Sequence, residues 1–75
     1  MLITLNKLHL NQKGIVKKIN CDDKITRRLY DLGLLENTKI FPIFSSPFGD
    51  PVAYEFRGNI IAIRNDDASN ILIEI

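Results

Sequence analysis

The chain has 75 residues, of which 45% are hydrophobic and 25% are charged, a composition that fits one folded domain over residues 1–75 and leaves too little apolar volume for a second core. Ten basic and nine acidic side chains give a net charge of +1, which excludes the broad basic field that gathers nucleic acid. The single cysteine excludes an internal disulfide.

The opening segment, residues 1–14, alternates leucines with polar side chains such as Asn6, Lys7 and His9. It lacks the continuous apolar run of a secretory signal peptide, and no later run approaches the roughly 20 apolar residues that span a bilayer. One unpaired cysteine fits a reducing compartment. We therefore expect a cytoplasmic protein that reaches a membrane only through a partner.

The first expected strand covers residues 13–20. Its inward-facing candidates, Val16 and Ile19, lie three residues apart. Because the side chains of a regular strand alternate with a period of two, this spacing predicts a bend or a bulge within the strand.

One helix is expected in the segment KITRRLYDLGL, where apolar side chains recur at helical spacing. The residues of this apolar face are Ile25, Leu29 and Leu32. Asp22 or Asp23 can accept hydrogen bonds from the unpaired N–H groups of the first turn, and a carboxylate there also favours the positive end of the helix dipole.

The end of this helix is signalled by Gly33, which can adopt the left-handed conformation that terminates a helix and packs Leu34 back onto Leu29. The residues that follow form a turn. Asn37 is expected to adopt a glycine-like conformation in it, and Asn11 to do the same earlier in the chain, because asparagine tolerates positive φ.

A second strand is expected over residues 39–44 and a loop over residues 45–51. Two prolines and a glycine predict this loop, because proline fixes φ and removes a ladder hydrogen bond while glycine permits a reversal of the chain. Phe48, a large aromatic residue, stands at the centre of the loop.

The strongest strand pattern covers residues 52–57, where apolar and polar side chains alternate. A return strand is expected over residues 60–64. Between them Gly58 and Asn59 predict a two-residue hairpin turn of type II′, because a glycine comes first.

Residues 65–69 predict a polar turn or a single helical turn, and residues 71–75 a last strand. Five short antiparallel strands are too few for a sandwich, and an open sheet would expose apolar edges. We therefore predict an all-β fold, a small SH3-like β-barrel of about five strands with one short α-helix inserted after the first strand.

The chemical groups do not predict an enzyme. His9 has no identifiable acid partner, so we expect a solvated surface histidine. Cys21 precedes two aspartates whose charge disfavours a thiolate, which predicts a structural cysteine. The sequence has no C-x-x-C, H-x-x-x-H or H-E-x-x-H spacing, and its four glycines are too scattered for a phosphate-binding loop. We expect no cofactor and no metal site.

Binding features are more informative. Arg27 and Arg28 should project from the polar side of the helix, and Phe48 from a stiffened loop, which offers the cationic and aromatic anchors that suit a protein interface. Two structural alternatives stay open, since an arginine can pair with Asp31 and the Phe48 ring can fold back over the barrel. The residues predicted to contact a partner are Arg27, Arg28, Leu34, Phe48 and Asp50.

A set of short motifs spans most of the chain: Arg28-Leu29-x-Asp31-Leu32-Gly33-Leu34, Thr38-x-Ile40, Pro47-x-Gly49-Asp50-Pro51, Gly58, Ala62-x-Arg64, Asp67-Ala68 and Ile71-x-Ile73. In order and spacing these motifs resemble the FeoA family, from about Leu5 to Ile73. Two positions depart from the family, because Asn11 and Asn37 stand where glycine is common; asparagine tolerates the same backbone conformation.

This resemblance implies an SH3-like barrel and a cytosolic accessory protein of bacterial ferrous iron uptake. The implied partner is FeoB, the membrane transporter with a GTP-binding domain. An alternative is a stand-alone domain that assists a metal-dependent transcriptional repressor, because similar domains occur in such repressors. An RNA-binding barrel is disfavoured, since Tyr54 and Phe56 share a face with Val52 that should be buried. Exposed strand edges favour a homo-oligomer of undefined copy number.

Overall fold

The computed structural model describes all 75 residues and contains six strands, two α-helices and one 3-10 turn. The elements are β1 (Leu2–Thr4), η1 (Leu5–Lys7), β2 (Gly14–Ile19), α1 (Asp23–Asp31), β3 (Lys39–Ser45), β4 (Val52–Phe56), β5 (Asn59–Ile63), α2 (Asn65–Ala68) and β6 (Ile71–Glu74).

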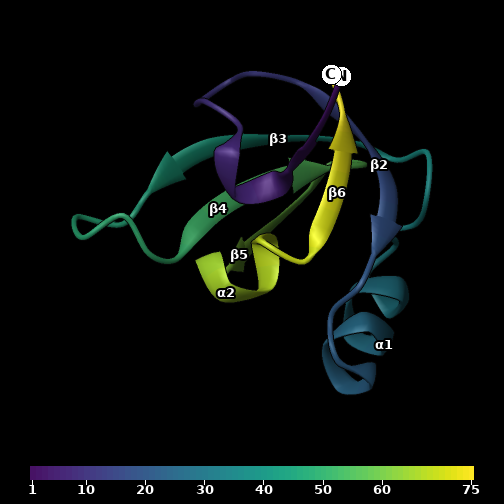
Figure 1. Ribbon diagram of the computed structural model, residues 1–75. Coiled ribbons are helices and arrows are strands. Elements are labelled where there is room, and N and C mark those ends of the chain that lie inside the picture. The colour runs from purple at the N-terminus through teal and green to yellow at the C-terminus, as the bar shows by residue number, and fades with distance from the viewer.

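The six strands form one antiparallel sheet in the order β1-β6-β2-β3-β4-β5. The sheet folds over on itself, so that β6 and β2 pass in front of β3 and β4 (Figure 1). This arrangement confirms the predicted mostly-β, SH3-like architecture. Its two edge strands are β1 and β5.

The sequence-based count of five strands and one helix was too low. The missed strand, β1, has three residues and pairs with β6 at the other end of the chain, through registers such as Leu2 with Glu74. A strand this short shows no reliable periodicity, and a distant partner stabilises it. The expected turn over residues 65–69 forms α2, a single helical turn.

The predicted irregularity in β2 is a bulge. Val16 pairs with Ile73 and Lys18 with Leu72, so one residue of β2 has no counterpart on β6. Because of this extra residue, Val16 and Ile19 both point into the core and are buried.

Gly14 is the first residue of β2 and lies in the sheet, not in a turn. A Cβ built at this position would lie 2.1 Å from Cγ2 of Ile73 on β6. Glycine is favoured here because the Ile73 side chain occupies the space that a Cβ would need.

Helix α1 begins where predicted, because Oδ1 of Asp22 accepts a hydrogen bond of 2.9 Å from the N–H of Ile25. Asp22, rather than Asp23, is therefore the cap. Leu29 is buried and Ile25 is half-buried against the core, but Leu32 is 40% exposed. The expectation that Leu32 continues the buried face is wrong, since it lies beyond the last helical residue.

The end of α1 follows the predicted glycine termination. Gly33 has a φ of +96°, its N–H donates to the carbonyl of Tyr30 at 2.9 Å, and the N–H of Leu34 donates to the carbonyl of Leu29 at 2.9 Å. These two bonds are those of a Schellman motif. They turn the chain back, so Leu34 enters the core.

Two asparagines have positive φ as predicted, with 66° at Asn11 and 71° at Asn37. The N–H of Asn37 donates to the carbonyl of Val16 at 2.7 Å, and that of Asn11 to the carbonyl of Pro42 at 2.8 Å. Both turns are therefore fixed to the sheet.

The hairpin between β4 and β5 is tight, but its turn is shifted from the predicted one. Phe56 pairs with Asn59, so the two turn residues are Arg57 and Gly58. Both have positive φ, 51° and 80°, as a type I′ turn requires and a type II′ turn does not. The glycine occupies the second turn position, which allows one more strand residue at Asn59.

One hydrophobic core holds these elements together; β1 adds the partly buried Ile3, which packs against it, and every other element contributes a buried residue. Its buried side chains are Leu5, Leu8, Val16, Ile19, Leu29, Leu34, Ile40, Tyr54, Phe56, Ile63, Ala68, Ile71 and Ile73.

Candidate protein-interaction surface

The Phe48 loop, residues 46–51, is closed by its own hydrogen bonds. The N–H of Ser46 donates to the carbonyl of Pro51 at 3.1 Å, and the N–H of Gly49 donates to the carbonyl of Ser46 at 2.9 Å. The N–H of Asp50 donates to the Ser46 hydroxyl at 3.0 Å. These bonds join both ends of the loop, so it has a defined shape.

Asp50 ties the Phe48 loop to α2. Its Oδ1 accepts a hydrogen bond of 2.9 Å from the N–H of Asn65, the first residue of that helix. The Asn65 side-chain amide in turn donates to the carbonyl of Gly49 at 3.1 Å. The carboxylate that we predicted to contact a partner is therefore engaged inside the chain, where it anchors the loop.

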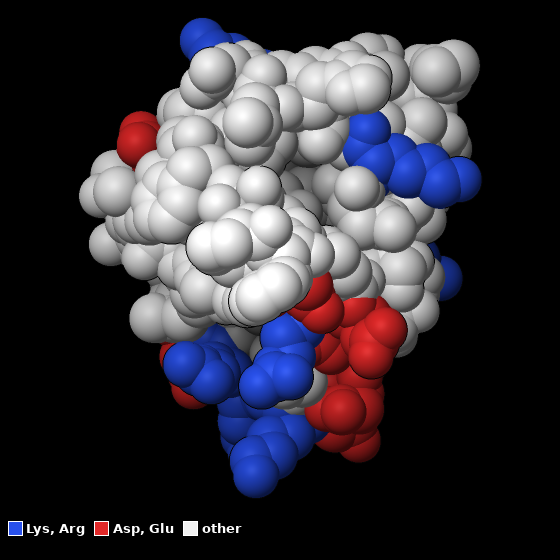
Figure 2. Space-filling model, turned by 90° about the vertical axis from the view of Figure 1, so that its left-hand side faces the viewer, with Lys and Arg blue, Asp and Glu red and all other residues white.

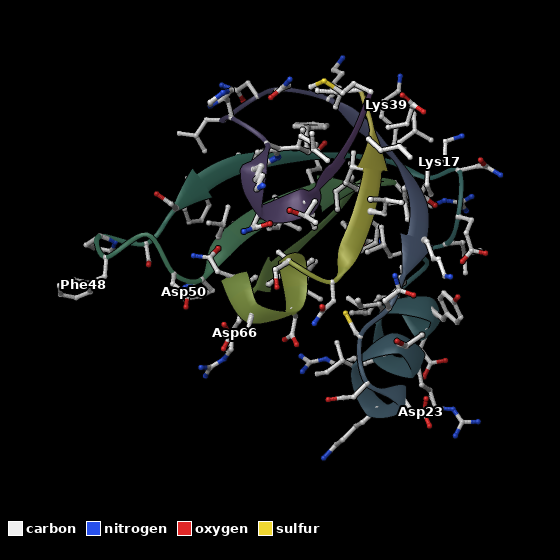
Figure 3. The ribbon with its side chains drawn as sticks, in the orientation of Figure 1. Lys17, Asp23, Lys39, Phe48, Asp50 and Asp66 are labelled. Carbon is white, nitrogen blue, oxygen red and sulfur yellow. The ribbon has the colours of Figure 1, made fainter.

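Phe48 stands at the tip of this anchored loop and is 96% exposed. Its ring points away from the body of the molecule (Figure 3). The alternative that the ring folds back over the barrel is wrong. Seen from the side on which the loop projects, most of the surface carries no charge, and charged side chains gather at one end, basic beside acidic (Figure 2).

Arg27 and Arg28 are both exposed on α1. The only ion pair in the structure joins the N-terminal ammonium to Glu74, so neither arginine pairs with Asp31 and that alternative is wrong as well. Both cations are available to a partner.

Leu34 leaves the predicted contact set. Its side chain is completely buried in the core, because the glycine termination of α1 folds it back beneath the helix. A partner cannot touch it without unfolding the domain.

The remaining predicted residues do not form one continuous surface. The Phe48 loop projects from one side of the molecule, whereas α1, marked by Asp23, lies at the opposite lower end (Figure 3). The structure therefore separates an aromatic region from a cationic region.

A feature that the sequence did not predict lies beside the cationic region. It is a surface hollow of about 150 Å³, which we call the α1–β5 hollow. Its walls come from α1 and β5, with one residue from α2, and the lining residues are Ile25, Arg28, Leu29, Ile61, Ala62, Ile63, Arg64 and Asp67. Only Arg28 belongs to the predicted contact set; Arg27 does not line the hollow.

The titratable groups show no catalytic arrangement. His9 is exposed, as expected. Cys21 is half-buried and its thiol donates to the carbonyl of Asp67 at 3.4 Å. Burial raises the pKa of this thiol, and the charges of Asp67 and Asp22 raise it further, which disfavours the thiolate, as the sequence predicted. No three His, Cys, Asp or Glu side chains are placed to hold a metal ion.

The family profile of the FeoA domain matches residues 3–75. The chain belongs to the FeoA family. The match confirms the sequence-based resemblance over almost the whole chain. The family is associated with ferrous iron transport.

Solved structures of FeoA proteins share the fold. The solution structure of FeoA from Chlorobium tepidum has a TM-score of 0.93 and 27% identity, over 97% of this chain and 70% of that one. The zinc-complexed crystal structure of FeoA from Stenotrophomonas maltophilia, described as a prokaryotic SH3 domain protein, has a TM-score of 0.84 and 24% identity, over 96% of this chain and 89% of that one.

A curated relative joins two proteins in one polypeptide. The chain is 22% identical over 71 residues to a fusion of Fe(2+) transport protein A with the Fe(2+) transporter FeoB, from Porphyromonas gingivalis. The match covers 95% of this chain but only 8% of the fusion protein. In the present structure neither α-helix is long and apolar enough to cross a bilayer.

Proposed function

We propose that this FeoA protein is a cytoplasmic, non-enzymatic accessory protein of ferrous iron uptake that binds the cytosolic, GTP-binding portion of a FeoB-like transporter. The observation that carries the proposal is the fusion of an FeoA-like segment to FeoB in the P. gingivalis relative. A covalent link holds two modules at high effective concentration, which is useful where the separate modules bind each other.

The surfaces on this chain support a role in binding. An aromatic ring that is 96% exposed on a hydrogen-bonded loop loses little conformational freedom when a partner covers it. Full burial of a phenylalanine side chain is worth about 1.5 to 3 kcal/mol. Arg27 and Arg28 add two cations without partners on the chain. We propose that partner contacts use Phe48 and these arginines, with Asp50 positioning the loop, and that nucleic acid takes no part.

The test is capture of the purified cytosolic domain of the FeoB-like transporter from the same organism. The unmodified chain should retain that domain, and Phe48→Ala and the double variant Arg27→Ala/Arg28→Ala should each weaken capture about tenfold or more. Leu35→Ala, which also truncates an exposed apolar side chain, is the matched control and should bind normally.

Equal capture by all three variants would remove the proposed contacts, and no capture by the unmodified chain would remove the proposed partner. Retention of a metal-dependent repressor in place of the transporter domain would favour the alternative function. Sedimentation of the isolated chain tests the expected homo-oligomer, for which the edge strand β1 offers unpaired backbone.

A further inference from the structure

Strand β5 has a free edge. It pairs only with β4, in a register that joins Phe56 to Asn59 next to a two-residue turn. The pair beside such a turn exchanges hydrogen bonds, and bonding pairs then alternate along the hairpin. The backbone groups of Ile60 and Ala62 therefore point away from β4, and no other hydrogen bond uses them.

The α1–β5 hollow lies along this strand. Its apolar lining includes Ile25 from α1 and Ile61 and Ile63 from β5. The hollow has a volume of about 150 Å³ and is open to solvent on one side, so it has room for one aliphatic side chain that enters from the surface.

The charge around the hollow is mainly positive. Arg28 on the α1 wall and Arg64 after the end of β5 both line it, and neither forms an ion pair. The stem of Arg57, at the other end of β5, lies beside Gly33. Asp67 is the only acidic residue in the lining, and it is half-buried. Its backbone carbonyl accepts a hydrogen bond from the Cys21 thiol.

We propose that an extended, acidic segment of a partner protein adds to the free edge of β5, with one aliphatic side chain in the α1–β5 hollow and carboxylates on Arg28 and Arg64. Strand addition supplies the backbone hydrogen bonds, and the hollow and cations supply specificity. The inference rests on the proposed function for the identity of the partner. It adds the chemistry of the transporter segment that docks here.

A second copy of this chain fits the edge poorly. Strand β5 carries no acidic residue and is flanked by Arg57 and Arg64. Antiparallel pairing of two β5 strands would bring Arg57 of one copy towards Arg64 of the other, and like charges on adjacent strands are destabilising.

The probe is the capped peptide Thr-Glu-Thr-Leu-Thr-Glu-Thr. Its two glutamates and its leucine occupy alternate positions and so share one face of an extended chain. Added to the isotopically labelled protein, it should shift the NMR signals of Ile60, Ala62 and the hollow, and should slow hydrogen exchange at the amides of Ile60 and Ala62. A peptide with lysines in place of the glutamates should not bind.

Two charge-reversal variants distinguish binding at the hollow from nonspecific electrostatic attraction. Arg28→Glu should weaken binding of the acidic peptide roughly fivefold or more, whereas Arg27→Glu, the same change one residue away and outside the lining, should change it less than about twofold. N-methylation of alternate peptide amides should abolish binding for one of the two alternating sets and spare the other, as strand addition requires.

Equal loss in Arg27→Glu and Arg28→Glu, unchanged exchange at Ile60 and Ala62, or pairing of β5 with a second copy would each overturn the inference. If the transporter domain is captured but the acidic peptide leaves β5 unaffected, the proposed function stands and this inference fails. If the peptide binds as described and the transporter domain is not captured, the binding edge stands and the proposed partner fails.

Discussion

The Phe48 loop and the α1–β5 hollow present binding chemistry in opposite ways. The loop is a convex projection, fixed by hydrogen bonds among its own residues and to Asn65, with one apolar ring at the tip. The hollow is concave, and its cations and free strand edge have no partner on the chain. The loop is complete without a ligand, whereas the hollow has unused bonding groups.

This difference shows how a domain of 75 residues can offer two separate contacts. A rigid projection suits a preformed pocket on a folded partner, since little freedom is lost when the ring is covered. A free strand edge suits a flexible segment, which takes its shape from the strand it joins. The substitutions below test whether the two regions are as independent as the structure indicates.

The largest effect is expected at Leu34, which we had predicted to be a contact residue. Because its side chain is fully buried in the core shared by both regions, Leu34→Ala should lower the free energy of unfolding by about 2 to 5 kcal/mol. Chemical denaturation measures this loss. Unchanged stability in this variant would mean that the Leu34 side chain is not buried, and would contradict the core described above.

The stability of the domain should fall at alkaline pH because Tyr54, on β4, is buried. Burial raises the pKa of Tyr54 to about 12, and the negative charge of Asp50 adds to the shift. Below pH 10 the phenol is protonated in both folded and unfolded chains. Between pH 10 and 12 the unfolded chain releases this proton and the folded chain retains it, so stability falls as pH rises, by about 2 to 3 kcal/mol in total.

Tyr54→Phe removes this titration, so the variant should lose less stability than the unmodified chain between pH 10 and 12. Denaturant titrations at several pH values measure the difference. The comparison is Tyr30→Phe: a hydrogen bond to Glu36 also raises the pKa of Tyr30, but this residue is exposed, so solvent screens the interaction and the substitution should alter the pH profile less than Tyr54→Phe does. Parallel profiles for the Tyr54→Phe variant and the unmodified chain would contradict a buried Tyr54.

Features set by local chain chemistry were predictable from the sequence. The Asp22 cap, the Gly33 termination and the positive φ of Asn11 and Asn37 each depend on a few adjacent residues. The bulge in β2 was visible because its inward residues broke a two-residue period. The loop that carries Phe48 was visible from its two prolines and its glycine, but the sequence left open whether the ring projects or folds back over the barrel.

Features that join distant segments were not predictable. Strand β1 forms only because β6 lies beside it, and Asp50 is anchored by Asn65, fifteen residues later. The α1–β5 hollow combines two elements that have no common motif. Leu34 is a different case, because the glycine termination already predicted that it packs back onto Leu29, which conflicts with its place in the predicted contact set.

Asp50 should stabilise the Phe48 loop without affecting the stability of the α1–β5 hollow. Asp50→Ala removes the acceptor for the first N–H of α2, which should cost about 1 kcal/mol of unfolding free energy. Hydrogen exchange should accelerate at the amides of Gly49 and Asn65 and stay unchanged in β5. Asp50→Asn keeps an acceptor oxygen and should retain most of the stability. Faster exchange in β5 as well would show that the two regions are coupled.

The smallest effect on stability is expected at Phe48. Since the ring is 96% exposed and lies outside the core, Phe48→Ala should change the free energy of unfolding by less than about 0.5 kcal/mol while reducing capture of the transporter domain. Phe56→Ala, which truncates a buried ring of the same type, should cost about 3 to 5 kcal/mol. A ring that adds nothing to folding yet stands on a hydrogen-bonded loop is best explained by contact with another molecule; a large stability loss in Phe48→Ala would instead assign the ring to the fold.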